Sequence, residues 1–168
     1  MGITVRRTTR DDWERLRALR LEALQDTPIA FGQTYENALD MTPSEWRAYA
    51  ARGEERHRLF VVAVDEESDR FIGMMGGAED HRGGPPFLVA VFVSPRFRGA
   101  RRGVSDLLLE SIEEWARRRS SRLQLDVHED NLRARRFYAS RGFVETGVTE
   151  PYPLDRTRRE INMVKRLA

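Results

Sequence analysis

The sequence contains no cysteine, and only one of its 29 basic residues, Lys165, is a lysine. Without cysteine the chain cannot form a disulfide scaffold, supply a thiol nucleophile or ligate zinc through thiolates. The three histidines show no spacing typical of a metal site. No hydrophobic run approaches the roughly 18 residues of a membrane-spanning helix, and charged side chains occupy the opening segment where a secretory signal would be apolar. We therefore expect a cytoplasmic domain with no metal and no membrane partner.

The length and composition are those of one globular domain. The 168 residues are 40% hydrophobic and 33% charged, which is enough apolar material for a core and argues against disorder. We expect a single domain over residues 1–168. The charge is unevenly divided, because residues 1–84 contain 12 cations and 16 carboxylates, net −4, whereas residues 85–168 contain 17 and 11, net +6. The basic second half indicates an anionic ligand there.

Hydrophobic periodicity predicts an α/β domain with the order β-α-α-β-β-β-α-β-α-β-β. Unbroken apolar runs at 59–64 and 87–93 are typical of strands buried on both faces of a sheet. Thr42, Pro43 and Glu45 predict a helix that begins with a capping box. We expect strands at 3–8, 59–64, 71–75, 87–93, 123–127, 143–148 and 161–164, helices at 13–25, 43–52, 104–119 and 131–140, and a turn at 151–153.

A basic, glycine-containing loop joins the strand at 87–93 to the helix that follows it. Its residues are Arg96, Phe97, Arg98, Gly99, Ala100, Arg101, Arg102 and Gly103. Backbone N–H groups at a helix start, the helix dipole and nearby arginines together favour an anion such as a phosphate. The loop lacks the Gly-Lys-Ser/Thr of a Walker A motif and the triple glycine of a dinucleotide site. A merely solvated basic loop is the alternative.

Two segments in this half resemble the GNAT (GCN5-related N-acetyltransferase) family. Residues 91–108 are similar to the family's acetyl-CoA-binding segment, whose signature is Arg/Gln-x-x-Gly-x-Gly/Ala. The second segment runs from Leu125 to Asn131 and is followed by Ala134, Phe137, Tyr138, Gly142 and Phe143. Residues 163–167 also resemble the family's last strand. Because both segments occur in the right order and spacing, the chain is identified as a member of this family.

The resemblance implies a mixed central β-sheet of about seven strands flanked by about four helices. It also implies transfer of an acetyl group from acetyl-CoA to a primary amine by direct attack, without a covalent enzyme intermediate. The backbone of Val91, Phe92 and Val93 would hold the pantetheine arm and polarise the thioester carbonyl. The other expected acetyl-CoA contacts are Arg98, Gly99, Ala100, Arg101, Arg102, Gly103, Val104, Asn131 and Tyr138. Arg101 stands where the signature has its middle glycine, which lets the pyrophosphate approach the backbone.

Tyr138 matches the family's tyrosine that protonates the departing CoA thiolate, although an aromatic at this spacing is also typical of a core. The general base is left open between Asp126, Glu79 and a water chain. His128 is a further candidate, because histidine is the side chain that ordinarily changes charge near neutral pH, but it follows a strand, and a solvent-facing position is its alternative. Asn131 is expected to cap the next helix and to lie near the CoA arm.

The amine acceptor is expected between the loop at 29–35 and the turn at 151–153. Phe31, Tyr35 and Tyr152 would form its aromatic walls, unless these rings only cap the core below the loop. Carboxylates of the acidic N-terminal half would attract a cationic amine. Antibiotics, polyamines, amino acids and protein N-termini are all acceptors within the family, and the fold does not choose among them.

Two other functions are weighed against this one. A non-catalytic acyl-CoA sensor would use the same fold, and a nucleic-acid-binding domain would use the arginine clusters. The second is disfavoured, because glutamates are interleaved with these arginines and the net charge is only +2. The expected partners are therefore acetyl-CoA and an amine acceptor, without nucleic acid, and homodimerisation is common in the family.

Overall fold

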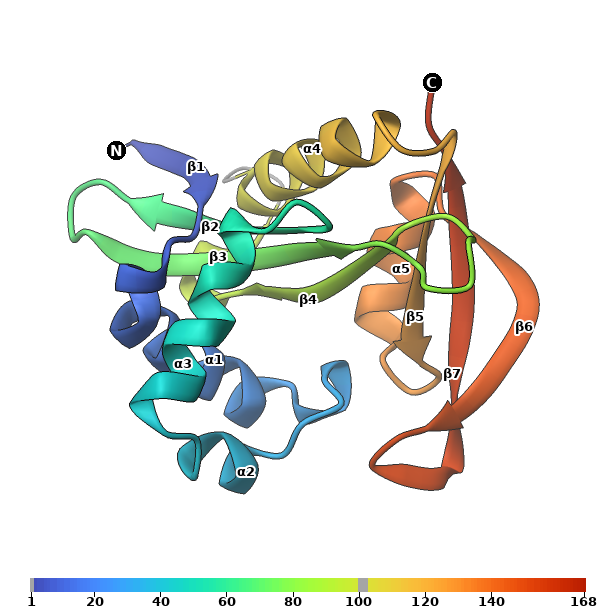
Figure 1. The fold of residues 1–168 in the computed structure, drawn as a ribbon. Helices are drawn as coiled ribbons and strands as arrows, with labels where there is room; N and C mark the ends of the chain where they lie inside the picture. The colour runs from blue at the N-terminus through green and yellow to red at the C-terminus, as the bar shows by residue number, and fades with distance from the viewer. Residues whose placement is uncertain (1, 100–102) are drawn as a thin grey trace.

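One mixed sheet runs through the computed structural model, which describes residues 2–99 and 103–168. The strand order across the sheet is β1-β2-β3-β4-β5-β7-β6, with β4 and β5 as parallel neighbours and the other pairs antiparallel (Figure 1). The strands are β1 (Ile3–Arg7), β2 (Arg58–Asp65), β3 (Arg70–Ala78), β4 (Phe87–Val93), β5 (Arg122–His128), β6 (Val144–Tyr152) and β7 (Asp155–Arg166). The helices are α1 (Trp13–Asp26), α2 (Tyr35–Leu39), α3 (Pro43–Ala50), α4 (Val104–Arg117) and α5 (Leu132–Ser140), with short 3₁₀ turns η1 (Arg10–Asp12), η2 (Pro28–Ala30), η3 (Ala51–Glu54) and η4 (Pro95–Phe97). The expected α/β class and the seven strands are confirmed.

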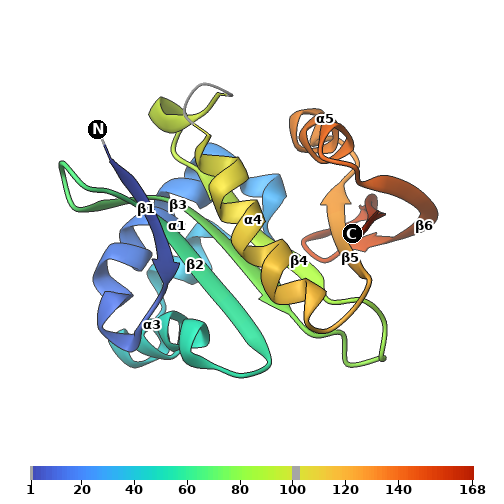
Figure 2. The same ribbon diagram turned by 90° about the horizontal axis from the view of Figure 1, so that it is seen from above.

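Helices cover both faces of the sheet (Figure 2). On one face, Leu16 of α1 and Trp46 of α3 belong to a buried core with residues of β2 and β3. On the other face, Leu108 and Trp115 of α4 belong to a second core, which also includes Tyr138 of α5. In the part of the chain that the structure describes, no helix is long and apolar enough to cross a membrane.

Two glycines of β3 allow α4 to lie close to the sheet. A Cβ atom added at Gly77 would be 2.7 Å from Cζ3 of Trp115, and one added at Gly73 would be 3.0 Å from Cδ1 of Leu108. Because protein interiors are close-packed, a side chain at either position would push α4 away from the sheet. The glycines that weaken the strand pattern in the sequence therefore serve helix–sheet packing.

The sheet opens between β4 and β5. These strands pair at one position, Phe87 opposite Gln124, and then diverge. The register of β4 against β3 shifts near Ala90, which has a positive φ of 54°. A non-glycine residue in this left-handed region is unusual and here marks a β-bulge. A large cavity lies where the two strands separate.

The predicted capping box at Thr42 is confirmed. Its Oγ1 accepts the Glu45 N–H at 3.1 Å, and the Glu45 carboxylate accepts the Thr42 N–H at 2.8 Å. After the loop near residue 30, the structure adds the short helix α2, which gives five α-helices in the described residues. The turn predicted at 151–153 lies at 153–154 instead, because Pro151 and Tyr152 belong to β6. Most of β6 is exposed at the sheet edge, where proline is tolerated and hydrophobic alternation does not reveal a strand's length.

Candidate functional site

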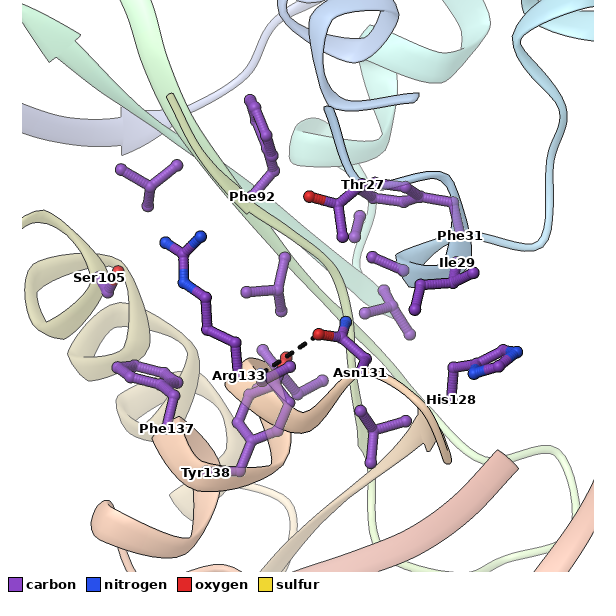
Figure 3. A pocket seen from close by; sticks show the side chains of 18 of the residues that line it. Thr27, Ile29, Phe31, Phe92, Ser105, His128, Asn131, Arg133, Phe137 and Tyr138 are labelled. Atoms are coloured by element: carbon purple, nitrogen blue, oxygen red, sulfur yellow. Dashed lines mark hydrogen bonds between the residues drawn. The ribbon is translucent and has the colours of Figure 1, made fainter. Parts of the chain in front are cut away.

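A cavity of about 870 Å³ lies between the diverging ends of β4 and β5 (Figure 3). We call it the main cavity. Its walls come from the α1–α2 connection, β4, the start of α4, the end of β5, α5 and the β6–β7 pair. Its volume falls in the range of about 300–1,000 Å³ that is typical of small-molecule sites.

The start of α4 forms one end of the main cavity. Gly103, with a φ of 65°, is the N-cap residue, and no side-chain hydrogen bond from the described residues caps the helix. The N–H groups of the first turn and the helix dipole favour an anion there. Gly99 lines the same end. Ala100, Arg101 and Arg102, which the sequence predicts as cofactor contacts, lie outside the described residues.

The side chain of Arg98 is used within the protein. Its Nε donates to the Val93 carbonyl at 2.7 Å, its Nη2 donates to Asp26 at 2.5 Å, and its guanidinium stacks over Phe92 at 5.4 Å. Burial alone would raise the pKa of the Asp26 carboxyl, but the hydrogen bonds from Arg98 and Thr27 and the nearby positive charges together outweigh burial, and that pKa is lowered. Arg98 therefore fastens the loop before α4 to the end of α1, and it can offer a phosphate only its remaining N–H groups.

Arg133 points into the main cavity from the first turn of α5 (Figure 3). It forms no ion pair with any residue that the structure describes, whereas Arg141 is paired with Asp106 at 2.8 Å. Burial lowers the pKa of Arg133, and the nearby Arg98 adds to this, but an arginine stays charged. Of these three arginines in the cavity wall, Arg133 is the most available to an anionic ligand.

Tyr138 of α5 and Asn131 at its N-cap face the main cavity (Figure 3). The Tyr138 ring packs edge-on against Phe137 and Phe143, so it belongs to the core as well as to the cavity wall. Burial raises the pKa of Tyr138, and its hydroxyl therefore stays protonated at neutral pH. The predicted capping role of Asn131 is confirmed, because its Oδ1 accepts the Ala134 N–H at 3.3 Å.

Two carboxylates line the main cavity on its β5–β7 side. Asp126 pairs across the strands with Asn162, and Glu160 pairs with His128, so the two carboxylates are diagonal neighbours on one face. Burial raises the pKa of Asp126, and repulsion from Glu150 adds to the shift, while a hydrogen bond from Asn162 at 3.0 Å opposes it. Burial also raises the pKa of Glu160, with repulsion from Asp126 and Glu150. Both groups therefore take up a proton at a higher pH than a free carboxyl in water does.

His128 lies in the cavity wall and does not face bulk solvent. Only 5% of its surface is exposed, its Nδ1 accepts the Asp130 N–H at 3.0 Å, and its ring packs edge-on against Tyr152 at 4.7 Å. Because Nδ1 accepts this hydrogen bond, the neutral ring has its proton on Nε2. The imidazole can thus donate a hydrogen bond at Nε2, but it has no free lone pair there to act as a base.

Glu79, the other side chain predicted as a base, does not line the main cavity. Arg119 and His57 each contact its carboxylate at 3.1 Å, and the hydrogen bond from Arg119 is the largest cause of its lowered pKa. A base must lie within hydrogen-bond reach of the proton that it removes, directly or through a water. Of the two predicted carboxylates, Asp126 is the one that the fold brings to the cavity.

The aromatic walls predicted for the acceptor are only partly present. Phe31 and Tyr152 line the main cavity, and Tyr152 Oη donates to the Phe31 carbonyl at 2.6 Å, which ties β6 to the α1–α2 connection. Tyr35 does not line it, because it begins α2 and packs against the core of α1 and α3. Val104 is also outside, because its side chain is buried in the core toward Gly73.

Sequence reasoning missed several cavity residues, namely Arg20, Tyr49, Arg52, Arg133 and Glu160. One of these residues, Arg20, could have been identified from the sequence. Arg20 interrupts the apolar face of α1 between Leu16, Leu19 and Ala23, all of which are buried. An arginine on such a face needs a reason to be there. The others come together only through strand pairing and helix packing, which residue spacing does not reveal.

Comparison with known proteins agrees with the fold. The sequence model of the acetyltransferase (GNAT) family matches residues 13–143. The chain belongs to this family. Among curated GNAT relatives, the peptidyl-lysine N-acetyltransferase YjaB of Salmonella typhimurium is 28% identical over 160 residues, which are 92% of this chain and 96% of that protein.

Solved structures share the GNAT fold over nearly the whole chain. An acetyltransferase of the GNAT family from Streptococcus pneumoniae superposes with a TM-score of 0.79 at 20% identity, covering 99% of this chain and 100% of its own. PaiA N-acetyltransferase from Thermoplasma acidophilum, solved in complex with coenzyme A, superposes with a TM-score of 0.75 at 17% identity over 99% of both chains. The family and fold predicted from the two sequence segments are thus confirmed.

Proposed function

We propose that this GNAT protein is an acetyl-CoA-dependent N-acetyltransferase that acts on a primary amine. The main support is that one cavity joins a helix N-terminus and an arginine with no ion-pair partner among the described residues to two carboxylates of raised pKa. The helix N-terminus and the arginine suit the phosphates of CoA, and the two carboxylates suit an amine. The PaiA relative was solved with coenzyme A, and the YjaB relative is named a peptidyl-lysine N-acetyltransferase.

The residues of the main cavity fit acetyl-CoA. The first turn of α4 after Gly103, together with Gly99 and Arg133, would hold its phosphates, and Asn131 would lie beside the pantetheine arm. Because β4 diverges from β5, backbone groups at Val91–Val93 on that edge are free of the β4–β5 pairing and can polarise a carbonyl. When bound there, acetyl-CoA supplies the acetyl group as an activated thioester.

Asp126 is the base that we propose, with Glu160 as its neighbour. The ammonium of the acceptor must lose one proton before its nitrogen can attack. Asn162 holds one oxygen of Asp126, and burial shifts the pKa of that carboxyl toward neutrality. Because the Asp126 and Glu160 carboxylates repel each other, a proton taken up by one also relieves that repulsion.

Tyr138 is the proposed proton donor on the leaving-group side. As the N–C bond forms and the C–S bond breaks, negative charge develops on sulfur, and the Tyr138 hydroxyl donates to it. A thiol has a reference pKa of about 8.5, and burial keeps the tyrosine above that value. Tyr138 therefore does not end the reaction deprotonated. It passes a proton to the sulfur and regains one from the nitrogen, which loses its second proton as the amide forms.

The experiment is thiol release from acetyl-CoA with a panel of primary amines. Wild-type protein should release thiol with at least one amine class, and Asp126→Asn should lower kcat/KM by about a hundredfold. Glu79→Gln, which alters a carboxylate outside the cavity, is the matched control and should keep the wild-type rate. Acetyl-CoA binding without thiol release from any amine would contradict the proposal and favour an acyl-CoA sensor.

We further propose that the protein acts in the cytoplasm and pairs with a second copy through β6. The absence of cysteine suits a reducing compartment. β6 is an edge strand, and its Val144 and Val148 are 66% and 57% exposed. Exposed apolar edge strands are prone to pairing with another chain. Light scattering should report a dimer for wild-type protein and a monomer for Val148→Lys, and a wild-type monomer would refute the pairing.

A further inference from the structure

A second cavity, of about 400 Å³, adjoins the main cavity beside α3. We call it the side cavity. The two cavities share Arg20, Gly32, Tyr49 and Arg52 in their walls, so a ligand in one can extend into the other. Among the described residues, no aspartate or glutamate lines the side cavity. Its polar lining is dominated by hydrogen-bond donors.

Arg20 is a buried cation that has no counterion in the described part of the chain. It is 8% exposed, its Nε donates to Oε1 of Gln33 at 3.1 Å, and its guanidinium lies over the Phe31 ring at 4.5 Å. Asp12 and Glu113, which are also buried, are both ion-paired, whereas Arg20 has no carboxylate within ion-pair distance in the residues that the structure describes. A buried charge is normally paired, so an unpaired one facing a cavity indicates a site for an anion.

Two further donors in the same wall are unsatisfied. Trp46 is 1% exposed, and neither its Nε1 nor the Tyr49 hydroxyl oxygen, both buried, has a hydrogen-bond partner among the described residues. Arg52 stacks over the Tyr49 ring at 4.8 Å and adds a second positive charge. Burying a polar group without a partner is unfavourable, and an acceptor-only ligand such as a carboxylate would satisfy these groups.

We propose that the side cavity binds a carboxylate of the amine acceptor, which makes the acceptor a free amino acid or a similar amine that also bears a carboxylate. Its anionic group would face Arg20, Arg52 and Tyr49, and its ammonium would face Asp126 in the main cavity. The charges of the acceptor and of the two walls are then complementary at both ends. This inference rests on the proposed N-acetyltransferase function and names its substrate class.

The experiment compares each acceptor with its own carboxamide. Thiol release from acetyl-CoA is measured with glycine, β-alanine and the proteinogenic L-amino acids, each as the free acid and as the amide. For the best acceptor, kcat/KM should be at least about tenfold higher for the acid, which is about 1.4 kcal/mol. Tyr49→Phe and Arg52→Gln should raise KM for the acid by about tenfold and leave the amide unchanged.

The variants are matched so that misfolding cannot imitate the result. Tyr49→Phe removes a hydroxyl that makes no hydrogen bond to any residue that the structure describes, so the Tm of this variant should not fall below that of wild type. Arg47→Gln, between the cavity residues Trp46 and Tyr49 on α3, removes a cation that stacks on Trp13 and lines neither cavity, and it should keep the wild-type preference. Arg20→Gln should abolish the preference and is interpreted only if its circular dichroism matches that of wild type.

A binding assay that needs no turnover completes the test. N-acetyl amino acids, which are the products, should raise the Tm of wild-type protein more than their N-acetyl amino-acid amides do, and Arg52→Gln should remove the difference. Equal kcat/KM for acids and amides, or equal Tm shifts for the two product series, would overturn the carboxylate site while leaving the N-acetyltransferase intact. Failure of the transferase itself would appear separately, as absence of thiol release with any amine, whether or not acetyl-CoA shifts the Tm.

Discussion

Replacement of Asp12 by asparagine is expected to destabilise the fold in a pH-dependent way. Asp12 is 4% exposed just before α1, and its carboxylate accepts hydrogen bonds from Arg6 at 2.8 and 2.9 Å, from Arg15 at 3.1 Å and from the Thr9 N–H at 2.8 Å. Burial alone would raise its pKa, but these hydrogen bonds, that of Arg6 foremost, outweigh burial and lower the pKa from 3.8 to about 2.

The shift in pKa corresponds to about 2 kcal/mol of stability at neutral pH. Because the pKa of the folded state is the lower one, this stability is present above about pH 4 and is lost as the pH falls toward 2. Between pH 7 and pH 3, the free energy of unfolding of wild-type protein should fall by about 1 kcal/mol as Asp12 is protonated. Asp12→Asn has no carboxyl at this position and should not show this loss. The stability difference between the two proteins should narrow by that amount.

Urea denaturation of both proteins at pH 7 and pH 3 measures this difference. Asp69→Asn is the matched control, because Asp69 pairs with the same Arg15 at 3.0 Å but its side chain is 82% exposed. Exposed ion pairs contribute little, so this variant should stay within about 0.5 kcal/mol of wild type at both pH values. If the stability deficit of Asp12→Asn is equal at pH 7 and pH 3, or no larger than that of the control, the Asp12 carboxylate does not stabilise the fold in this way.

Three further variants test the packing, the acid and the base. Gly77→Ala places a methyl group 2.7 Å from the Trp115 ring, and thermal unfolding should show a loss of about 1–3 kcal/mol. Tyr138→Phe should lower kcat for thiol release by about a hundredfold while calorimetry shows unchanged acetyl-CoA affinity; an unchanged kcat would exclude the proton relay. Asp126→Asn should gain stability relative to wild type between pH 4 and pH 8, because a raised folded-state pKa means that stability is lost as the pH rises through it. Urea denaturation at pH 4 and pH 8 measures the difference in unfolding free energy between Asp126→Asn and wild type, and a difference that is the same at both pH values would disprove the prediction.

Buried and capped elements could be predicted from the sequence, whereas exposed ones could not. Strands β2 and β4 appear as unbroken apolar runs because they are covered on both faces. The capping box at Thr42 predicts where α3 begins. By contrast, α2 has five residues with only Ala38 buried, and β6 is exposed along most of its length. Neither element leaves a clear hydrophobic period, so α2 was missed and β6 was predicted too short.

The candidate site was predictable only where its residues follow one another along the chain. The start of α4, Asn131 and Tyr138 lie in segments that resemble a known family, and the fold places all of them at the main cavity. Glu160 reaches the cavity because β7 pairs with β5, which spacing cannot show. The inward position of Arg98 depends on Asp26, 72 residues away. Long-range contacts of this kind decide which polar residues meet.

Thermal unfolding is the first test of the proposal that the main cavity binds acetyl-CoA through the start of α4 and Arg133. At about a hundred times Kd, acetyl-CoA should add about 2.7 kcal/mol to the stability of wild-type protein, or about 5–10 °C in Tm for a chain of this length. ATP at the same concentration should produce no comparable shift in Tm. Arg133→Gln should need a higher acetyl-CoA concentration than wild-type protein to reach the same shift in Tm. No shift with acetyl-CoA, or an equal shift with ATP, would contradict the claim.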